Sequence, residues 1–240
     1  MKFVKHCLLV ISMLTATASL FAQTADDIIA KHLAAVGGKE KLAGITTVKM
    51  ASTNTVMGNE APATITIVNG KGFRSEADMM GSKMIQVITD KGGWMVNPMM
   101  GSSDPQALPE EQAKAGLGQI YVEPFLNYAE KGSKVEYLGQ EKVGSVNTYK
   151  VKLTDKNGTA TTYFFDPNTY YTVQAVRTAE MMGQQMDITI GYSDFKKTDY
   201  GWVVPQTTDI NMGGQFAITS KLKNIEINTP VDAAVFEMKK

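Results

Sequence analysis

The sequence predicts a mainly β protein in which one long, curved antiparallel sheet carries a few short helices over its concave face. Three observations lead to this prediction. Long segments alternate apolar and polar residues with period two, the dipeptides Asn69-Gly70 and Gly213-Gly214 separate neighbouring segments as hairpin turns do, and helical patterns occur only near the start and in the middle. A sheet of this length must curl or close, and so few helices can cover only one opening.

The first element is a helix that begins after Thr24, a residue suited to capping it. Asp26 and Asp27 then lie at the positive end of the helix dipole. One apolar face is formed by Ile28, Ile29, Leu33 and Val36. Gly37-Gly38 ends the helix, and a second short helical turn at 39–43 leads into the strands.

The strands fall into two groups on either side of a helical middle. The first group covers residues 46–57, 61–68, 71–79, 84–89 and 94–96. A loop rich in Met, Gly, Ser and Pro is expected at 98–109, and short helices at 110–115 and 122–130. The second group covers 134–139, 147–153, 159–165, 171–177, 186–192, 202–212 and 215–227. Of these twelve segments we expect about ten or eleven to be separate strands. Because no linker divides the strands, residues 23–240 are expected to form a single domain.

Residues 1–22 have the features of a secretory signal peptide. Lys2 and Lys5 flank the start of an apolar stretch that is too short to span a bilayer, and small residues follow. Cleavage is expected after Ala18 or Ala22. We therefore expect the mature protein to be exported and soluble, with a membrane anchor as the alternative.

The charge and residue counts exclude several classes of function. The chain has 24 basic and 24 acidic side chains, so it has no excess positive charge for nucleic acid or an anionic membrane surface. Cys7 and His6 lie in the leader, which leaves His32 as the only histidine of the mature chain. This removes Cys or multi-His zinc sites and most nucleophilic pairs. We expect a structural His32, no metal and no cofactor.

Methionine is frequent, with 15 residues, and it is clustered. Segments 79–84 and 181–186 both have the form Met-Met-Gly-x-x-Met, and Met99-Met100-Gly101 adds a third cluster. Unbranched thioethers adapt to ligands of variable shape, so the clusters predict a deformable apolar pocket mouth. Two alternatives stay open: the methionines fill gaps in the core, or their Met-x-x-x-Met spacing binds Cu(I).

Several short segments follow one another in a characteristic order: 72–76 (GFRSE), 90–94 (DKGGW), 192–195 (YSDF), 201–205 (GWVVP) and 228–232 (NTPVD). Over nearly the whole mature chain this order resembles the outer-membrane lipoprotein carrier superfamily, the LolA-like proteins. The resemblance implies an incomplete antiparallel β-barrel with a helical lid, whose cavity holds lipoprotein acyl chains while they cross the periplasm. It also implies an arginine that bonds the lid. Arg74 is the candidate for this lid lock, and Arg177 is the only other arginine.

We therefore expect a periplasmic carrier that does no chemistry and moves acyl chains of lipoproteins or lipids toward the outer membrane. An inner-membrane donor and an outer-membrane acceptor are the implied partners, and the carrier is expected to be a monomer. Two other classes stay open: an envelope sensor or interaction module that uses the same cavity, and a hydrolase that uses carboxylates such as Glu110 and Glu111. The cavity is expected to be lined by the inward residues Ile65, Ile67, Phe73, Met84, Trp94, Met99, Phe125, Tyr149, Val151, Ile188 and Ile190.

Overall fold

The computed structural model describes residues 23–79, 81–98, 101–181, 184–214 and 216–238. The signal peptide expected at 1–22 lies outside these residues. Within the described part of the chain, no helix combines the length and the apolar character needed to cross a membrane.

Two short helices open the described chain, as predicted. Helix α1 (Ala25–Ala35) starts at Thr24, whose hydroxyl accepts a hydrogen bond from the Asp27 N–H at 3.1 Å while the Asp27 carboxylate accepts from the Thr24 N–H at 3.2 Å. The apolar side of α1, with Ile28 and Leu33, is buried against the sheet. Helix α2 (Lys39–Ala43) follows directly.

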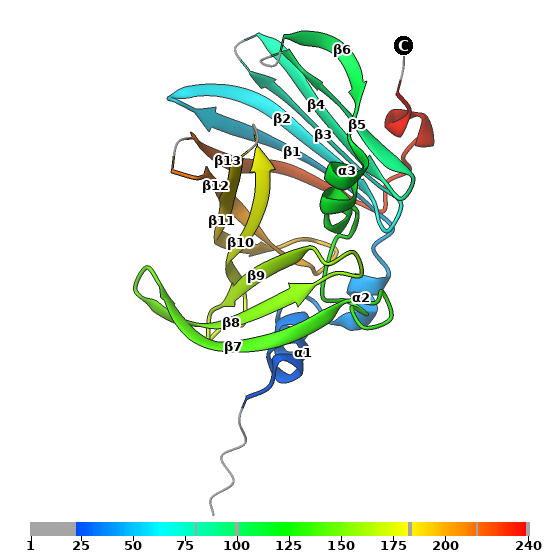
Figure 1. The fold of residues 1–240 in the computed structure, drawn as a ribbon. Coiled ribbons are helices and arrows are strands. Elements are labelled where there is room, and N and C mark those ends of the chain that lie inside the picture. Colours follow the sequence, from blue (N-terminus) through cyan, green and yellow to red (C-terminus); the bar gives the residue numbers. More distant parts are fainter. Residues whose placement is uncertain (1–22, 80, 99–100, 182–183, 215, 239–240) are drawn as a thin grey trace, which may run out of the picture.

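The strands form one antiparallel sheet, with more strands than the sequence predicted. Thirteen strands pair in the order β6-β5-β4-β3-β2-β1-β13-β12-β11-β10-β9-β8-β7 among the described residues (Figure 1). Their bounds are β1 (Thr47–Val56), β2 (Asn59–Val68), β3 (Gly72–Met79), β4 (Ser82–Thr89), β5 (Gly92–Asn97), β6 (Ser102–Ala107), β7 (Lys134–Val143), β8 (Val146–Thr154), β9 (Ala160–Phe165), β10 (Thr172–Met181), β11 (Gln184–Lys197), β12 (Val203–Met212) and β13 (Phe216–Ile227). The sheet is open and curved, an incomplete barrel.

The expectation of a loop over all of 98–109 is wrong, because strand β6 lies within this range. Trp94 of β5 pairs with Ala107, and Asn97 pairs with Ser102. Pro105 is unfavourable in a strand inside a sheet, since proline has no N–H to donate to the neighbouring strand. At the edge of a sheet that donor is not needed, so proline is tolerated there.

The strand order decides where the middle of the chain must run. Strands β6 and β7 are the two edges of the sheet, yet they are consecutive in sequence. Residues 108–133, here called the crossing segment, therefore span the open side of the curved sheet. The segment contains α3 (Glu110–Gly116) and the 3₁₀ helix η2 (Leu117–Ile120), which packs against β3 and β4 (Figure 1).

The helix expected at 122–130 is also corrected, since this part of the crossing segment is a series of turns. Hydrogen bonds there connect residues three apart, such as the Leu126 N–H to the Glu123 carbonyl at 3.3 Å. Asn127 has a φ of 52°, in the left-handed region that interrupts a helix.

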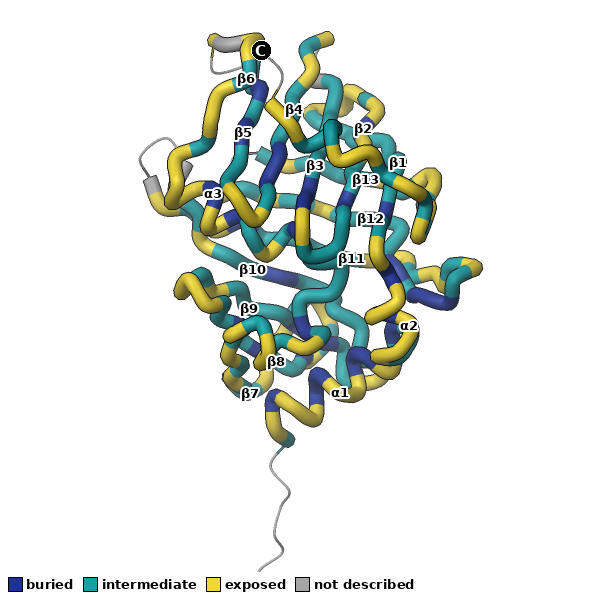
Figure 2. Tube along the Cα trace, turned by 90° about the vertical axis from the view of Figure 1, so that its right-hand side faces the viewer, coloured by how far each residue is buried: buried dark blue, intermediate teal, exposed yellow. Residues whose placement is uncertain are grey.

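Strand register assigns each side chain to one of two faces, because neighbouring positions point to opposite sides. On the concave face, Ile67 lies opposite Phe73, which lies opposite Ile88, and these side chains join the main core with α1. On the convex face, Val87, Trp94 and Val96 form a second, smaller core with Phe236 of the 3₁₀ helix η3 (Ala233–Phe236). Buried positions accordingly occur along α1 and at intervals along the strands (Figure 2).

Candidate functional site

A cavity of about 380 Å³ lies between the concave face, α1 and the crossing segment. This volume is near the lower end of the range of small-molecule sites, about 300–1,000 Å³, so a slender ligand suits it better than a bulky one. Apolar side chains on its wall include Val36 directly after α1, Leu153 of β8, Ala175 of β10, Ile190 of β11 and Trp202 before β12. The strands supply one wall of the cavity, and α1 and the crossing segment supply the other.

The crossing segment closes this cavity through residues 121–125. Phe125 is 1% exposed and is the anchor of the segment. Its ring packs edge-on against Tyr163 of β9, with centroids 4.7 Å apart, and against His32 of α1, with centroids 5.8 Å apart.

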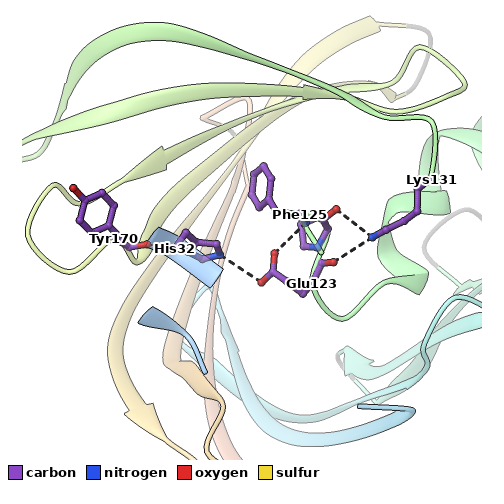
Figure 3. Close-up of polar contacts among 6 residues, drawn as sticks. His32, Glu123, Phe125, Lys131 and Tyr170 are labelled. Atoms are coloured by element: carbon purple, nitrogen blue, oxygen red, sulfur yellow. Dashed lines mark hydrogen bonds and ion pairs between the residues drawn. The ribbon is translucent and has the colours of Figure 1, made fainter. Parts of the chain in front are cut away.

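His32 holds the crossing segment to α1 by a polar contact (Figure 3). Its Nδ1 lies 2.8 Å from the Tyr170 carbonyl oxygen, and its Nε2 lies 3.4 Å from Glu123 Oε2. A backbone carbonyl can only accept, so Nδ1 carries a proton, and a second proton on Nε2 turns the other contact into an ion pair. Burial alone would lower the pKa of His32, but the Glu123 charge and the hydrogen bonds to Glu123 and Tyr170 outweigh it and raise this pKa.

Further contacts fix the same segment. The second carboxylate oxygen of Glu123 accepts the Phe125 N–H at 3.1 Å, and Lys131 donates to the carbonyls of Glu123 at 3.4 Å and Pro124 at 3.2 Å (Figure 3). The Tyr128 hydroxyl bonds the Asp26 carboxylate of α1. Sequence reasoning assigned Glu123 no role. The only signal was His32 itself, a polar residue placed next to the apolar face of its helix.

Arg177 of β10 is a second basic residue on the wall of this cavity, besides His32. Tyr163 and Tyr192 also line the cavity and are near enough to interact with its charge. Burial raises the pKa of Tyr192 to about 12 and also raises the pKa of Tyr163, so both hydroxyls keep their protons at neutral pH. Burial lowers the pKa of Arg177, although the two tyrosines oppose this effect.

The expected cavity residues fall on both faces of the sheet. By register and packing, the concave side holds Ile65, Ile67, Phe73, Met84, Phe125, Tyr149, Val151, Ile188 and Ile190. Of these, Phe125 and Ile190 line the cavity described above. Trp94 lies on the convex face, where it pairs with Val87 and packs against the smaller core, because its position in β5 has the opposite parity. Met99 lies outside the described residues.

Arg74, the expected lid lock, also lies on the convex face. Its Nη1 donates to the Val235 carbonyl at 2.8 Å, its Nε donates to Glu76 at 2.7 Å, and its guanidinium lies over the Trp94 ring at 5.4 Å. These groups line a second pocket under η3. The carbonyl that Arg74 binds therefore belongs to the C-terminal 3₁₀ helix and not to the crossing segment.

The methionine clusters are only partly described. Met84 lies in β4 on the concave face, whereas Met80, Met99, Met100 and Met182 lie outside the described residues. Within the described part of the chain, no three His, Cys, Asp or Glu side chains gather as metal ligands would. The pocket-mouth interpretation of the clusters stays a prediction.

No protein-family model matches the sequence, and no curated protein is detectably similar to it. Solved structures are similar over nearly the whole chain. A LolA-superfamily protein from Nitrosomonas europaea is 13% identical, covers 91% of this chain and 99% of its own, and superposes with a TM-score of 0.55.

The chain has the LolA-like fold. Two further solved structures are similar to the same extent. An outer membrane lipoprotein-sorting protein domain from Vibrio parahaemolyticus is 12% identical, with 88% of this chain and 94% of that chain covered at a TM-score of 0.55. A DUF1329-family protein from Desulfovibrio piger is 12% identical, with 88% and 96% covered at a TM-score of 0.56. The incomplete barrel with a helical layer over its concave face, expected from the sequence, is confirmed.

Proposed function

We propose that the protein is an exported carrier that binds acyl chains of lipoproteins or lipids in its cavity and moves them through the periplasm toward the outer membrane. The observation that carries this proposal is the hollow, mostly apolar space between the concave sheet face and the crossing segment. Each buried methylene is worth about 0.8 kcal/mol, so an acyl chain leaves a bilayer only for a site that is similarly apolar.

A carrier must also release its ligand, and the crossing segment suits this requirement. Beyond the packing of Phe125, it is joined to α1 by the contacts of Glu123 and Tyr128. Breaking these contacts, together with the hydrogen bonds that Ile120 and Val122 make to the turn between β2 and β3, would uncover the cavity without opening a strand pair. The wall of the sheet would then stay intact while the ligand enters or leaves.

The fold supports the remaining parts of the proposal. The Vibrio parahaemolyticus structure of the same fold is described as a lipoprotein-sorting domain. We propose that residues 1–22 are a signal peptide, that 23–240 form one monomeric domain in the periplasm, and that an inner-membrane donor and an outer-membrane acceptor are its partners. In this function the protein performs no catalysis and uses no cofactor.

The first experiment is native mass spectrometry of the protein purified from its own envelope. We expect a bound lipid or acylated lipoprotein. A protein partner recovered without any lipid would instead favour an envelope sensor or interaction module built on the same cavity, and would contradict the carrier.

A second experiment tests whether the cavity is the binding site. A Cβ added at Gly118, which lines the cavity at an exposed position, would meet no atom within 4 Å, so Gly118→Leu adds a bulky side chain at the cavity rim without backbone strain. We expect this variant to bind a fluorescent fatty acyl probe at least about tenfold more weakly, because the probe would lose several methylene contacts. Gly191→Leu is the matched control, since its added Cβ would meet only ordinary contacts with Asp209. Equal binding by both variants would contradict the assignment.

A further inference from the structure

Arg177 occupies a position in β10 where an apolar residue would be expected. Register places it opposite Ile188 of β11, and its neighbour on the same face, Ala175, lies opposite Ile190. Both partners are apolar, and Ile190 lines the cavity together with Arg177. A guanidinium therefore lies next to the apolar side chains that β11 contributes to the cavity wall.

The guanidinium has no protein partner within the described residues. Its Nε is buried and makes no hydrogen bond, and no described Asp or Glu forms an ion pair with it. The two acids that line the same cavity are already engaged. Glu123 binds His32 and the Phe125 N–H, and Asp155 Oδ1 accepts the N–H groups of Asn157 at 2.9 Å and Thr159 at 2.8 Å.

A half-buried guanidinium whose buried Nε makes no hydrogen bond is unfavourable, because that N–H loses its contact with water and gains no protein partner in exchange. A ligand that brings a negative oxygen would remove this penalty. The planar guanidinium fork matches the two oxygens of a carboxylate or a phosphate, and such charge-assisted hydrogen bonds are about twice as strong as neutral ones.

We infer that the cavity binds an anionic amphiphile, with the carboxylate or phosphate oxygens of its head on Arg177 and its acyl chain along the apolar wall near Ile188 and Ile190. Tyr163 and Tyr192 lie beside this head. Because their hydroxyls stay protonated, they are neutral neighbours and do not repel an anion. The inference rests on the proposed function and names the class of ligand that the cavity prefers.

The test uses three probes of equal chain length on the full chain: dodecanoate, dodecyl phosphate and dodecanol. Binding is measured by displacement of a fluorescent acyl probe from the parent, from Arg177→Gln and Arg177→Lys, and from Arg74→Gln. Arg74→Gln is the matched control, because it removes the chain's other arginine from the opposite face of the sheet.

We expect Arg177→Gln to weaken binding of the preferred anionic probe by about ten- to a hundredfold, the size of a lost charge-assisted hydrogen bond, while dodecanol binding is unchanged. Arg177→Lys should restore part of the loss, and Arg74→Gln should bind as the parent does. The anion that binds the parent more tightly identifies the head group as a carboxylate or a phosphate.

A second measurement separates ligand recognition from a structural role. Arg177→Met removes an unpaired cation from an apolar wall, so we expect the ligand-free variant to melt no lower than the parent. A structural arginine would give a lower melting temperature, and that result would overturn the inference.

Equal loss of binding of all three probes in Arg177→Gln would overturn it as well, as would no loss at all. If dodecanol binds the parent and Arg177→Gln alike while the anions show no dependence on Arg177, the inference fails and the proposed function stands. If none of the three probes binds the parent, both fail.

Discussion

His32 of α1 and Glu123 of the crossing segment form an ion pair inside the molecule, with side chains only 5% and 10% exposed. The pair connects the first helix to the segment that closes the cavity. Removing one partner of a buried pair leaves the other charge without compensation, which costs more than the pair itself contributes. The pair is therefore a sensitive point in both the stability and the closure of this protein.

We predict that His32→Ala lowers the free energy of unfolding by about 3 kcal/mol, because Glu123 would remain buried without its partner. Urea denaturation measures this change. Glu110→Ala is the control, since the Glu110–Lys114 ion pair on α3 is shorter, at 2.7 Å, but exposed, so its loss should change the unfolding free energy little. A similar small loss for both variants would contradict the central role of the pair.

The same pair predicts a pH dependence. The pKa of His32 is raised in the folded protein, so its stabilisation is complete below the unfolded value of about 6.5 and is lost as the pH rises through the folded pKa. The difference in unfolding free energy between the parent and His32→Gln should therefore shrink as the pH rises above about 6.5. A difference that grows, or stays constant, over this range would contradict a charged His32.

Gly93 of β5 has no space for a side chain. An added Cβ would lie 2.6 Å from the Val87 carbonyl oxygen and 2.9 Å from Leu108 Cδ1. We expect Gly93→Ala to destabilise the protein by about 1–3 kcal/mol in thermal or urea unfolding, since the backbone must move. Gly118→Ala, whose Cβ would meet nothing within 4 Å, should stay within about 0.5 kcal/mol of the parent.

Arg74→Leu distinguishes two roles of Arg74, which either holds the C-terminal η3 in place or locks the lid over the cavity. Its partners Val235 and Glu76 lie on the convex side, so we expect faster hydrogen exchange in residues 232–237 and an unchanged dissociation rate of the acyl probe. Faster release of the probe would instead support Arg74 as the lid lock that the family resemblance implies.

Met50 and Met84 test the expectation that thioethers form a soft apolar surface. Register places both on the concave face, Met50 opposite Ile65 and Met84 opposite Ala77. Changing both to Leu keeps volume and apolarity, so binding of the acyl probe should fall less than about threefold, whereas changing both to Gln should weaken it more strongly. Titration with Cu(I) checks the alternative: copper binding by the parent that is lost in the Leu variant would favour metal ligation.

Local patterns in the sequence determined the elements and the fold class. Thr24 and Asp27 define the start of α1 through contacts within four residues, and period-two alternation assigns residues such as Ile65 and Ile67 to one face of a strand. These features depend on neighbours in the chain, so they can be read without coordinates. The edge strand β6 was missed because Pro105 is unfavourable in every strand except an edge, and edge position is not a local property.

The tertiary structure alone decided which residues meet across the cavity. Alternation tells which residues share a face but not which face is concave, so only the register of β5 and β3 placed Trp94 and Arg74 on the convex side. The partnership of His32 with Glu123 arises from the crossing segment, which brings distant parts of the chain together, and the lack of a described partner for Arg177 arises from its apolar neighbours on β11. Hydrogen bonds and ion pairs act over a few ångströms in space, and no spacing along the sequence determines those distances before the sheet has curved.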